Sequence, residues 1–462
     1  MDQETGTSKQ PPTSATVSLQ AHLERRLIPA TSSSRYVDFF IRAEHIAHIT
    51  EQQRLSLKLA IVLDRSGSMQ GHKIETAKHA VLAVLDQLTP RDAIALAIFD
   101  DQIDVIQELA TVTAERKSQI REILSTLQAR ASTALHEGWL AGCNALTGSI
   151  ESGGKSQQEH NRLARCFLLT DGIANVGITD PEHIASEAAG VREHTNISTS
   201  TFGIGNDYNE LLLGPMAVAG GGQFHHLRTA DEITKTFVGE LGGLLAVAVR
   251  HVRLELELEP EMQAELISPY WEHTSSHRHS IAIGDLQSEE ERHVVIRLGF
   301  PEQGAQEMRV IRARLVWQGD ENEFHTDWQE LRFFYASESA CDGEAQNADV
   351  MHQVGLHEAD RARREAISAN NRGDLTRARD YLKKTAQAVS AYAGNDSALQ
   401  NEIHDLYSLD QLIESAPMAA PVAKEVYYKQ QLRSRQQADY RSDPSPEPPA
   451  NPTSTEPKPI EN

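Results

Sequence analysis

The chain has 462 residues and a net charge of −22, from 66 acidic and 44 basic residues. Its length predicts about three domain-sized units. The acidic balance argues against binding to nucleic acid or to anionic membranes, because both need clustered Lys and Arg. The first 15 residues lack a basic start and an apolar core, and the apolar segment 237–249 is short and carries Glu240. We therefore predict neither a secretory signal nor membrane insertion, and we expect a cytoplasmic protein.

Three cysteines occur, Cys143, Cys166 and Cys341, without CxxC spacing. An odd number of cysteines, two of them in apolar segments, predicts buried free thiols in a reducing compartment.

Residues 1–15 are rich in Ser, Thr, Gln and Pro and are predicted to be disordered. Residues 16–50 follow with two runs of alternating apolar and polar residues, TVSLQAHLERRLI and SRYVDFFIRAEHI. Each run predicts a strand, and no helical pattern separates them.

Residues 55–248 alternate apolar strands with amphipathic helices, which predicts an α/β domain with a doubly wound, mostly parallel six-stranded sheet. The run DAIALAIFD lies too close to IDVIQEL for a crossover helix, so these two strands form a hairpin and the third strand is antiparallel. A sheet order of 3-2-1-4-5-6 is expected. Asp180 and Pro181 suit the cap and the first position of a helix.

Residues 249–336 alternate apolar and polar residues, with turn signals such as IGDL and WQGDEN, as β-sandwiches do. We expect the strands of residues 16–50 to join this β-sandwich, which makes the α/β domain an insertion. Residues 345–428 predict a helical segment, either a plain helical hairpin with small residues at the contact or one tetratricopeptide-like unit. The Pro-rich tail 433–462 is predicted to be disordered.

The stretch LKLAIVLDRSGSM predicts a buried strand that ends in a cluster of oxygen side chains, Asp64, Ser66 and Ser68. Ligands of open α/β sheets lie at this end of the strands. Taken alone, the pentapeptide DRSGS at residues 64–68 is equally typical of a turn that caps the following helix.

Two more loops carry oxygen groups, with Thr133 before a helix and Asp171 after the fourth strand. The expected sheet order places these groups beside the first loop. Two carboxylates and three hydroxyls suit Mg²⁺, with Mn²⁺ or Ca²⁺ as alternatives. We expect the hydroxyls to bind the metal directly and the carboxylates to act largely through water. One metal position then stays open for an Asp or Glu of a protein partner.

Competing chemistry finds less support in the sequence. A nucleophilic Ser66 or Ser68 would need a base, yet there is no GxSxG motif, and His72 is expected on a helix surface. No GxxxxGK[ST] phosphate loop occurs. The remaining candidates are expected to be turn residues (Asp100 and Asp101) or histidines outside any metal site, with a surface role for the last two (His225, His226, His277 and His279).

The chain resembles von Willebrand factor type A domain proteins with a metal-ion-dependent adhesion site, through the DxSxS at Asp64, Ser66 and Ser68, then Thr133, and the TDG that includes Asp171. The segments TDGIANVGITD, STFGIGNDYNELLLGPMA and AGGGQF resemble bacterial stand-alone members, which carry a β-domain and helices beside the A domain. One departure is ASTAL, where many members have glycine before the threonine.

The residues and the resemblance together predict a non-enzymatic, Mg²⁺-dependent protein-binding module. Two alternatives stay open. One is a metal-dependent hydrolase that activates a water. The other is a structural scaffold in which the metal is only architectural.

Overall fold

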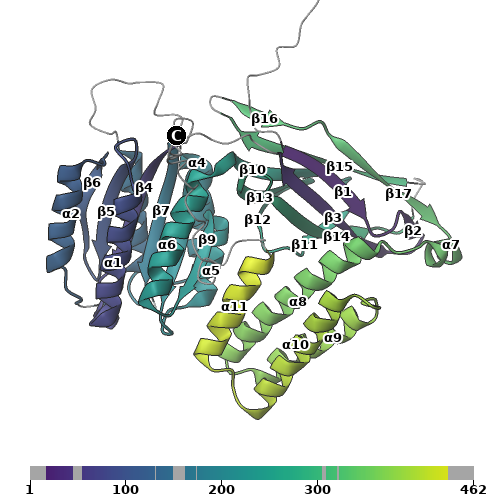
Figure 1. The fold of residues 1–462 in the computed structure, drawn as a ribbon. Coiled ribbons are helices and arrows are strands. Elements are labelled where there is room, and N and C mark those ends of the chain that lie inside the picture. The colour runs from purple at the N-terminus through teal and green to yellow at the C-terminus, as the bar shows by residue number, and fades with distance from the viewer. Residues whose placement is uncertain are drawn as a thin grey trace, which may run out of the picture.

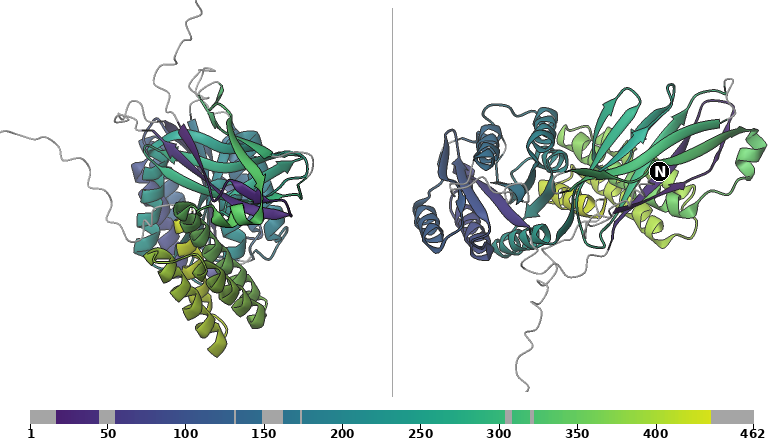
Figure 2. Two further views of the ribbon diagram at one scale, coloured as in Figure 1. Left: turned by 90° about the vertical axis from the view of Figure 1, so that its right-hand side faces the viewer. Right: turned by 90° about the horizontal axis from the view of Figure 1, so that it is seen from above.

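The computed structural model describes residues 17–44, 55–130, 132–148, 162–172, 174–303, 308–319 and 322–434. The described chain forms an α/β part, a part made of two β-sheets, and a group of helices beneath them (Figures 1 and 2). The predicted disordered segment 1–15 and residues 435–462 of the predicted disordered tail 433–462 lie outside the described residues. The prediction is wrong for Arg433 and Ser434, which belong to the last helix.

The α/β part contains a six-stranded sheet of order β6-β5-β4-β7-β8-β9. Neighbouring strands are parallel, except that β6 runs antiparallel to β5. The predicted order and the predicted hairpin are therefore confirmed. Central strand β4 is apolar almost throughout, because both faces of a parallel sheet are covered. The strands are β4 (Ser56–Asp64), β5 (Ala93–Phe99), β6 (Ile103–Thr111), β7 (Arg162–Thr170), β8 (Ile197–Ile204) and β9 (Gly221–Leu227).

Helices cover both faces of this sheet. One apolar core joins it to α1 (His72–Gln87), α2 (Ala114–Thr126) and α6 (Ala230–Leu245). The core on the other face includes α3 (Leu135–Thr147), α4 (Pro181–Thr195) and α5 (Glu210–Ala219). Helix α4 begins as predicted, with Asp180 accepting a hydrogen bond from the His183 amide at 2.8 Å and proline in the first turn.

The β part consists of two sheets, of order β1-β3-β14-β11 and β12-β13-β10-β15-β17-β2, with β16 paired to β15. Apolar residues of both sheets form one shared core. Strands from before and after the α/β part pair with each other, as β3 does with β14. The strands are β1 (Val17–Leu23), β2 (Leu27–Pro29), β3 (Ser33–Ala43), β10 (Val247–Glu257), β11 (Gln263–Leu266), β12 (Trp271–Ser275), β13 (Arg278–Gln287), β14 (Glu291–Phe300), β15 (Met308–Gln318), β16 (Glu323–His325) and β17 (Gln329–Ala336).

Two predictions for the β part are wrong. The run TVSLQAHLERRLI is not one strand, because β1 and β2 lie in different sheets. The motif IGDL is not a turn between strands but lies inside β13. There Gly284 has a φ of 99°, so the glycine permits an irregular backbone within the strand instead of ending it.

The helical part begins with α7 (Glu338–Gly343) and α8 (Ala348–Asn371), followed by α9 (Leu375–Ser390), α10 (Ser397–Ser415) and α11 (Ala420–Ser434). Helices α8 and α9 pack with small residues at their contact, and buried alanines such as Ala366 and Ala378 lie in one core. Helix α11 lies between this group and the α/β part (Figure 1). A Cβ added to Gly214 of α5 would lie 2.3 Å from the Tyr427 hydroxyl, so the two helices are in close contact.

Ion pairs between buried side chains tie the parts together. Arg165 of β7 pairs with Asp285 of β13, and Lys424 of α11 pairs with Glu210 of α5 at 2.7 Å. The three cysteines are buried and free, as predicted. Among the described helices none is long and apolar enough to cross a membrane.

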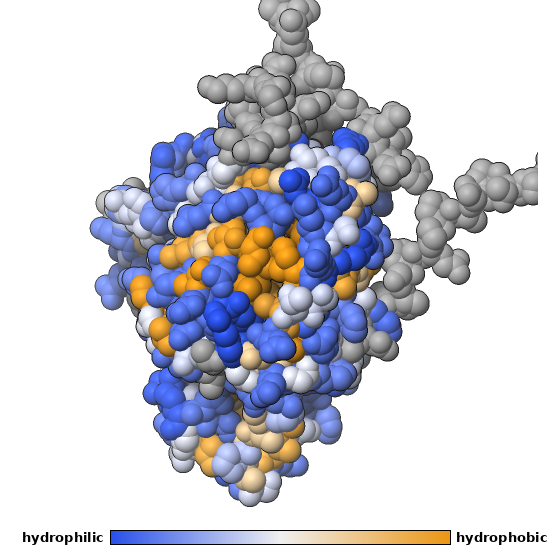
Figure 3. All heavy atoms as spheres, turned by 90° about the vertical axis from the view of Figure 1, so that its left-hand side faces the viewer, coloured by the Kyte–Doolittle hydropathy of each residue, from blue (hydrophilic) through white to orange (hydrophobic). Residues whose placement is uncertain are grey.

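The end of the α/β part far from the β-sheets displays apolar side chains within a hydrophilic surface (Figure 3). Edge strand β6 contributes Val105, which is 36% exposed. Apolar side chains thus gather on this face of the molecule.

Candidate metal site

The carboxyl end of β4 delivers the first three predicted ligands. Asp64 ends the strand, and its Oδ1 accepts a hydrogen bond from the Ser66 amide at 2.7 Å, which holds the chain in a turn. A short 3₁₀ turn, η1 (Gly67–Met69), follows. It brings the Ser66 and Ser68 hydroxyl oxygens to 3.1 Å from each other. The alternate spacing of the three side chains thus converges on one point, because the backbone curls beneath them.

The other two predicted ligands reach the same point from separate loops. The Ser68 hydroxyl donates a hydrogen bond to Asp171 Oδ1 at 2.8 Å. A Cβ built on Gly172 would lie 3.2 Å from Thr133 Oγ1, 3.4 Å from Ser68 Oγ and 3.5 Å from Asp64 Oδ2. All five residues named from the sequence are therefore brought together around the space above Gly172.

The electrostatics of this crevice disfavour the ionised form of Asp64. Asp64 and Asp171 are both fully buried. Burial raises the pKa of Asp64 to about 6, against the lowering effect of hydrogen bonds from Thr170 and Ser66 and with the nearby Asp171 charge adding to the rise. The Thr170 hydroxyl donates to Asp64 Oδ2 at 2.5 Å. Two buried acids so close to each other are stabilised in the ionised state by a nearby cation.

Lys73, which the sequence analysis missed, supplies one such cation. Its ammonium forms an ion pair with Asp171 and a second with Asp207 at 3.1 Å. Partial burial alone would lower the pKa of Lys73, but the hydrogen bonds to both aspartates raise it. Lys73 lies on the first turn of α1, nine residues after Asp64, so neither residue type nor spacing marks it as a partner of the fourth strand.

Asp100 orders the first loop from the neighbouring strand end. It is fully buried and accepts hydrogen bonds from Arg65 Nε at 2.8 Å and Arg130 Nε at 2.6 Å. It also accepts from the Gln102 amide at 2.7 Å, so the predicted turn role is confirmed, with a positioning role added to it. The pKa of Asp100 is lowered, because these hydrogen bonds outweigh the effect of burial.

Asn175 positions the threonine loop. Its side-chain Oδ1 accepts a hydrogen bond from the backbone N–H of Thr133 at 3.0 Å. The backbone N–H of Asn175 donates to the Thr133 carbonyl oxygen at 3.3 Å. This pair of contacts fixes Thr133 although the preceding residue is Ser132 and not glycine. The asparagine within TDGIAN was the available signal for this partner.

The histidines lie outside the crevice, and they bind other side chains. His225 Nε2 lies 3.2 Å from Glu240, and His226 Nδ1 lies 2.7 Å from the Tyr208 hydroxyl, all within the core. The predicted surface position of His279 is wrong. Its side chain is buried and lies 2.5 Å from Glu272 of β12, a strand that the sequence analysis did not predict.

The donor set fits a hard divalent cation. It offers two carboxylates and three hydroxyls, all oxygen, at the edge where parallel sheets bind ligands. Among the described residues no group of three or more His, Cys, Asp or Glu side chains forms a metal cluster. At the crevice, Ser66, Ser68 and Thr133 would supply hydroxyl oxygens beside the two carboxylates.

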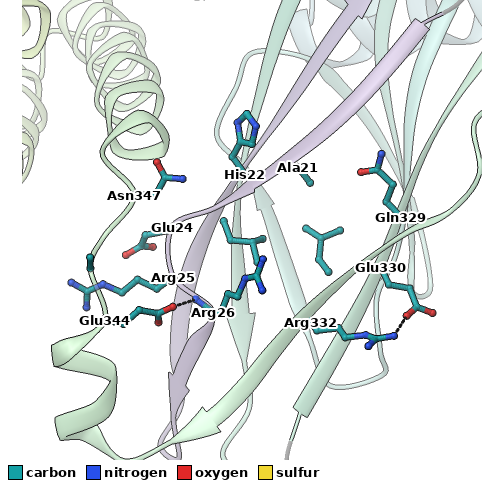
Figure 4. Close-up of a pocket in the computed structure, with 13 residues that line it drawn as sticks. Ala21, His22, Glu24, Arg25, Arg26, Gln329, Glu330, Arg332, Glu344 and Asn347 are labelled. Atoms are coloured by element: carbon teal, nitrogen blue, oxygen red, sulfur yellow. Dashed lines mark hydrogen bonds and ion pairs between the residues drawn. The ribbon is translucent and has the colours of Figure 1, made fainter.

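A second cavity, of about 640 Å³, lies between β1, β17 and the segment that leads to α8 (Figure 4). Most of its charged side chains form hydrogen bonds or ion pairs with neighbouring groups of the protein. Glu344 accepts hydrogen bonds from the amides of Arg26 and Leu27 at 2.9 and 2.8 Å, and Arg332 pairs with Glu330 at 2.7 Å. The hydrogen bonds of Glu344 hold β2 against the segment that leads to the helical part. The residues that line the cavity carry equal numbers of glutamate and arginine side chains.

Comparison with known proteins identifies the α/β part. Residues 58–238 match the model of the von Willebrand factor type A domain. These residues therefore form a von Willebrand factor type A domain, with its α/β fold and mixed sheet.

The sequence relatives match part of the chain. An uncharacterised protein of Synechocystis sp. is 26% identical over 279 residues, which cover 58% of this chain and 62% of that protein. Human inter-alpha-trypsin inhibitor heavy chain H4 is 30% identical over 167 residues, or 36% of this chain and 17% of that protein. The chain thus spans less than two thirds of the length of these relatives.

Solved structures extend the likeness to the whole described fold. A von Willebrand factor type A protein from Catenulispora acidiphila aligns with a TM-score of 0.64 at 17% identity, covering 87% of this chain and 99% of that one. The ArnB paralog VWA2 from Sulfolobus acidocaldarius aligns with a TM-score of 0.59 at 15% identity, covering 91% and 99%. At these identities the likeness concerns the fold alone.

Proposed function

We propose that this protein binds Mg²⁺ at the crevice above Gly172 and, through the metal, an acidic side chain of a protein partner. The observation that carries the proposal is the convergence of five oxygen-bearing side chains, with Thr133, Ser68 and Asp64 all within 3.5 Å of one point. Von Willebrand factor type A domains commonly serve as metal-dependent protein interaction modules, which supports the same conclusion.

Each side chain has a defined part in this proposal. Ser66, Ser68 and Thr133 hold the ion through neutral hydroxyl oxygens, while Asp64 and Asp171 supply the negative charge and orient the hydroxyls. Neutral direct ligands leave the bound ion strongly electrophilic, so it can accept a carboxylate from outside. Mn²⁺ has the same ligand preference and serves as a probe, and Ca²⁺ is a further alternative. The wider expectations of a cytoplasmic location and of no nucleic-acid partner stay predictions.

Binding is favoured over hydrolysis because both crevice carboxylates, the nearest candidates for a general base among the described residues, are engaged by other side chains. Asp171 pairs with Lys73 and Ser68, and Asp64 accepts hydrogen bonds from Thr170 and Ser66. The two alternatives remain testable. A metal-dependent hydrolase would turn over phosphoesters or peptides with Mg²⁺ or Mn²⁺ and lose this turnover in Asp171→Ala. A scaffold would bind its partners equally well in chelator.

The experiment compares the full chain with Asp64→Ala and with Asp101→Ala, which changes an exposed acid at the same sheet edge. Mn²⁺ binding is measured by electron paramagnetic resonance, and immobilised chain is then used to capture protein from a lysate in Mg²⁺ or in EDTA. We expect wild type and Asp101→Ala to bind Mn²⁺ and to capture a partner only in Mg²⁺, and Asp64→Ala to do neither. Mn²⁺ binding by Asp64→Ala at wild-type affinity would contradict the proposed site.

A further inference from the structure

We propose that a second site, at the junction of the α/β part and the β part, binds a small oxyanion such as a phosphate or carboxylate group. The site is a cavity of about 290 Å³ between the end of α4, the start of β8 and strands β10, β12, β13 and β16. It lies at the amino end of β8, and the metal crevice lies at the carboxyl end of the same sheet. The two sites are therefore separate.

Arg192 is the residue that would bind the anion. It lies in the last turn of α4 and lines the cavity, and only 9% of its surface is exposed. Within the part of the chain that the structure describes, its guanidinium has neither a hydrogen bond nor an ion pair. A buried guanidinium without an anion is costly, whereas its planar fork matches two oxygens of a phosphate or carboxylate. Burial lowers the pKa of Arg192 and the adjacent Glu193 opposes this, but the group remains charged.

Glycine at the start of β9 keeps room for this side chain. A Cβ on Gly221 would lie 2.6 Å from Arg192 Cδ and 3.3 Å from its Nη1. Any larger residue at position 221 would displace the arginine. Ser198 and Ser280 also line the cavity and add hydroxyl groups that can donate to an anion.

Several arginines lie at or near the cavity, with Arg192 and Arg253 in its lining and Arg165 and Arg250 close to His251. Burial, and then the charges of Arg165, Arg192 and Arg250, lower the pKa of His251 to about 3, so this lining histidine is neutral. The buried carboxylate of Asp285 is already engaged, by Arg165 and by the His251 amide at 2.8 Å.

Two acids line the cavity beside its two arginines, but neither acid forms an ion pair with Arg192. Glu323 forms a bidentate ion pair with Arg253 at 2.7 and 2.9 Å. Glu193 is exposed to solvent. Arg192 is thus left without a hydrogen-bonded or ion-paired anion among the described residues.

The backbone around the cavity is irregular in a way that ordinary strand packing does not require. The pairing of β10 with β13 shifts register on both sides of Val252. Three residues that line the cavity have left-handed backbone, Asn196 with a φ of 57°, His251 with 50° and Gly284 with 99°. Asn196 is the usual left-handed cap of α4 and Gly284 is a glycine, so among these three residues backbone strain is confined to His251, beside the irregular pairing of β10.

The test is calorimetric titration of the full chain with inorganic phosphate and, separately, with succinate. All titrations contain EDTA, which keeps the metal crevice out of the measurement. The variants are Arg192→Gln, Arg192→Lys and His273→Asp, the last of which adds negative charge at an exposed lining position with little risk to folding. Arg121→Gln, at an exposed arginine of α2, is the matched control.

We expect wild type and Arg121→Gln to bind at least one of the two anions with equal affinity. Arg192→Gln and His273→Asp should weaken binding by about tenfold or more, and Arg192→Lys by less, because lysine keeps the charge but loses the fork. Circular dichroism checks that each variant is folded. Absence of binding of both anions to wild type, or unchanged affinity in a folded His273→Asp and Arg192→Gln, would overturn the proposal.

Discussion

The substitution Gly172→Ala tests the metal crevice without removing any ligand. The added methyl would lie 3.2 Å from Thr133 Oγ1, 3.4 Å from Ser68 Oγ and 3.5 Å from Asp64 Oδ2. The backbone of Gly172 is not left-handed, so alanine adds no conformational strain there. The Thr133 hydroxyl must give way by a few tenths of an ångström, and an apolar group enters the space between the oxygens. Mg²⁺ requires near-ideal geometry, so we expect metal affinity to fall about tenfold to a hundredfold.

The assay is Mn²⁺ titration followed by electron paramagnetic resonance, with thermal unfolding in EDTA as the measure of folding. Gly190→Ala is the matched control, because a Cβ at this position in α4 meets no atom within 4 Å. The control should keep its metal affinity and gain up to about 1 kcal/mol of stability in the free energy of unfolding, as helix propensity predicts. If Gly172→Ala binds Mn²⁺ as tightly as Gly190→Ala does, the oxygens around Gly172 do not hold the metal.

Three further predictions concern charged side chains, one beside the metal crevice and two in the interior of the protein. Lys73→Met removes the ammonium that pairs with Asp171, so Mg²⁺ should bind more tightly while the metal-free chain melts at a lower temperature; weaker Mg²⁺ binding in calorimetry would contradict this. Lys424→Met leaves Glu210 buried without its cation and should cost about 3–5 kcal/mol in urea unfolding, most of it recovered when Glu210→Gln is added. The pKa of Glu240 is lowered, because its hydrogen bonds to neighbouring side chains outweigh burial, so its contribution to stability is complete above the ordinary pKa of 4.5 and is lost as the pH falls below it. Glu240→Gln should therefore lose less stability than wild type between neutral pH and pH values below 4.5, and an equal loss would refute the assignment.

The α/β part was predictable from sequence because its determinants are local. Each buried parallel strand is a continuous apolar run, and the short gap between β5 and β6 leaves only a hairpin. The ligand positions followed from the same rule, since Asp64 and Asp171 end neighbouring strands of known order. The order of the sheet brings together Asp64, Ser66, Ser68 and Asp171, whereas Thr133 reaches them from a loop that Asn175 holds in place.

The β part was harder because alternation marks a strand but not its partner. Nothing in TVSLQAHLERRLI shows that β1 pairs with β3 while β2 pairs with β17, more than 300 residues away. Short strand β12, which pairs with β13, escaped the pattern as well. Burial of His279 depends on that pairing, and so does its contact with Glu272.

Groups that tune the crevice were missed for a related reason. Lys73 and Asp207 are typical surface residues by type. Only the packing of α1 near Asp171 and near the loop after β8 lets Lys73 pair with both Asp171 and Asp207. Arg192 lies in the last turn of α4, where a basic residue is ordinary. Its burial arises from contact with a different part of the chain, and periodicity within one helix does not report such contacts.

The short segment 207–210 explains why the metal crevice belongs to the whole chain and not only to the von Willebrand factor type A domain. At one end, Asp207 shares the Lys73 ammonium with the crevice. At the other end, Glu210 forms its buried ion pair with Lys424 of α11, whose ammonium lies 4.7 Å from the ring of Tyr208. Deletion of the helical part would leave Glu210 without its cation and would loosen the loop that carries Asp207. A domain excised at residues 58–238 would then differ from the full chain in metal affinity even with every ligand intact, because the cation that competes for Asp171 would be held less firmly.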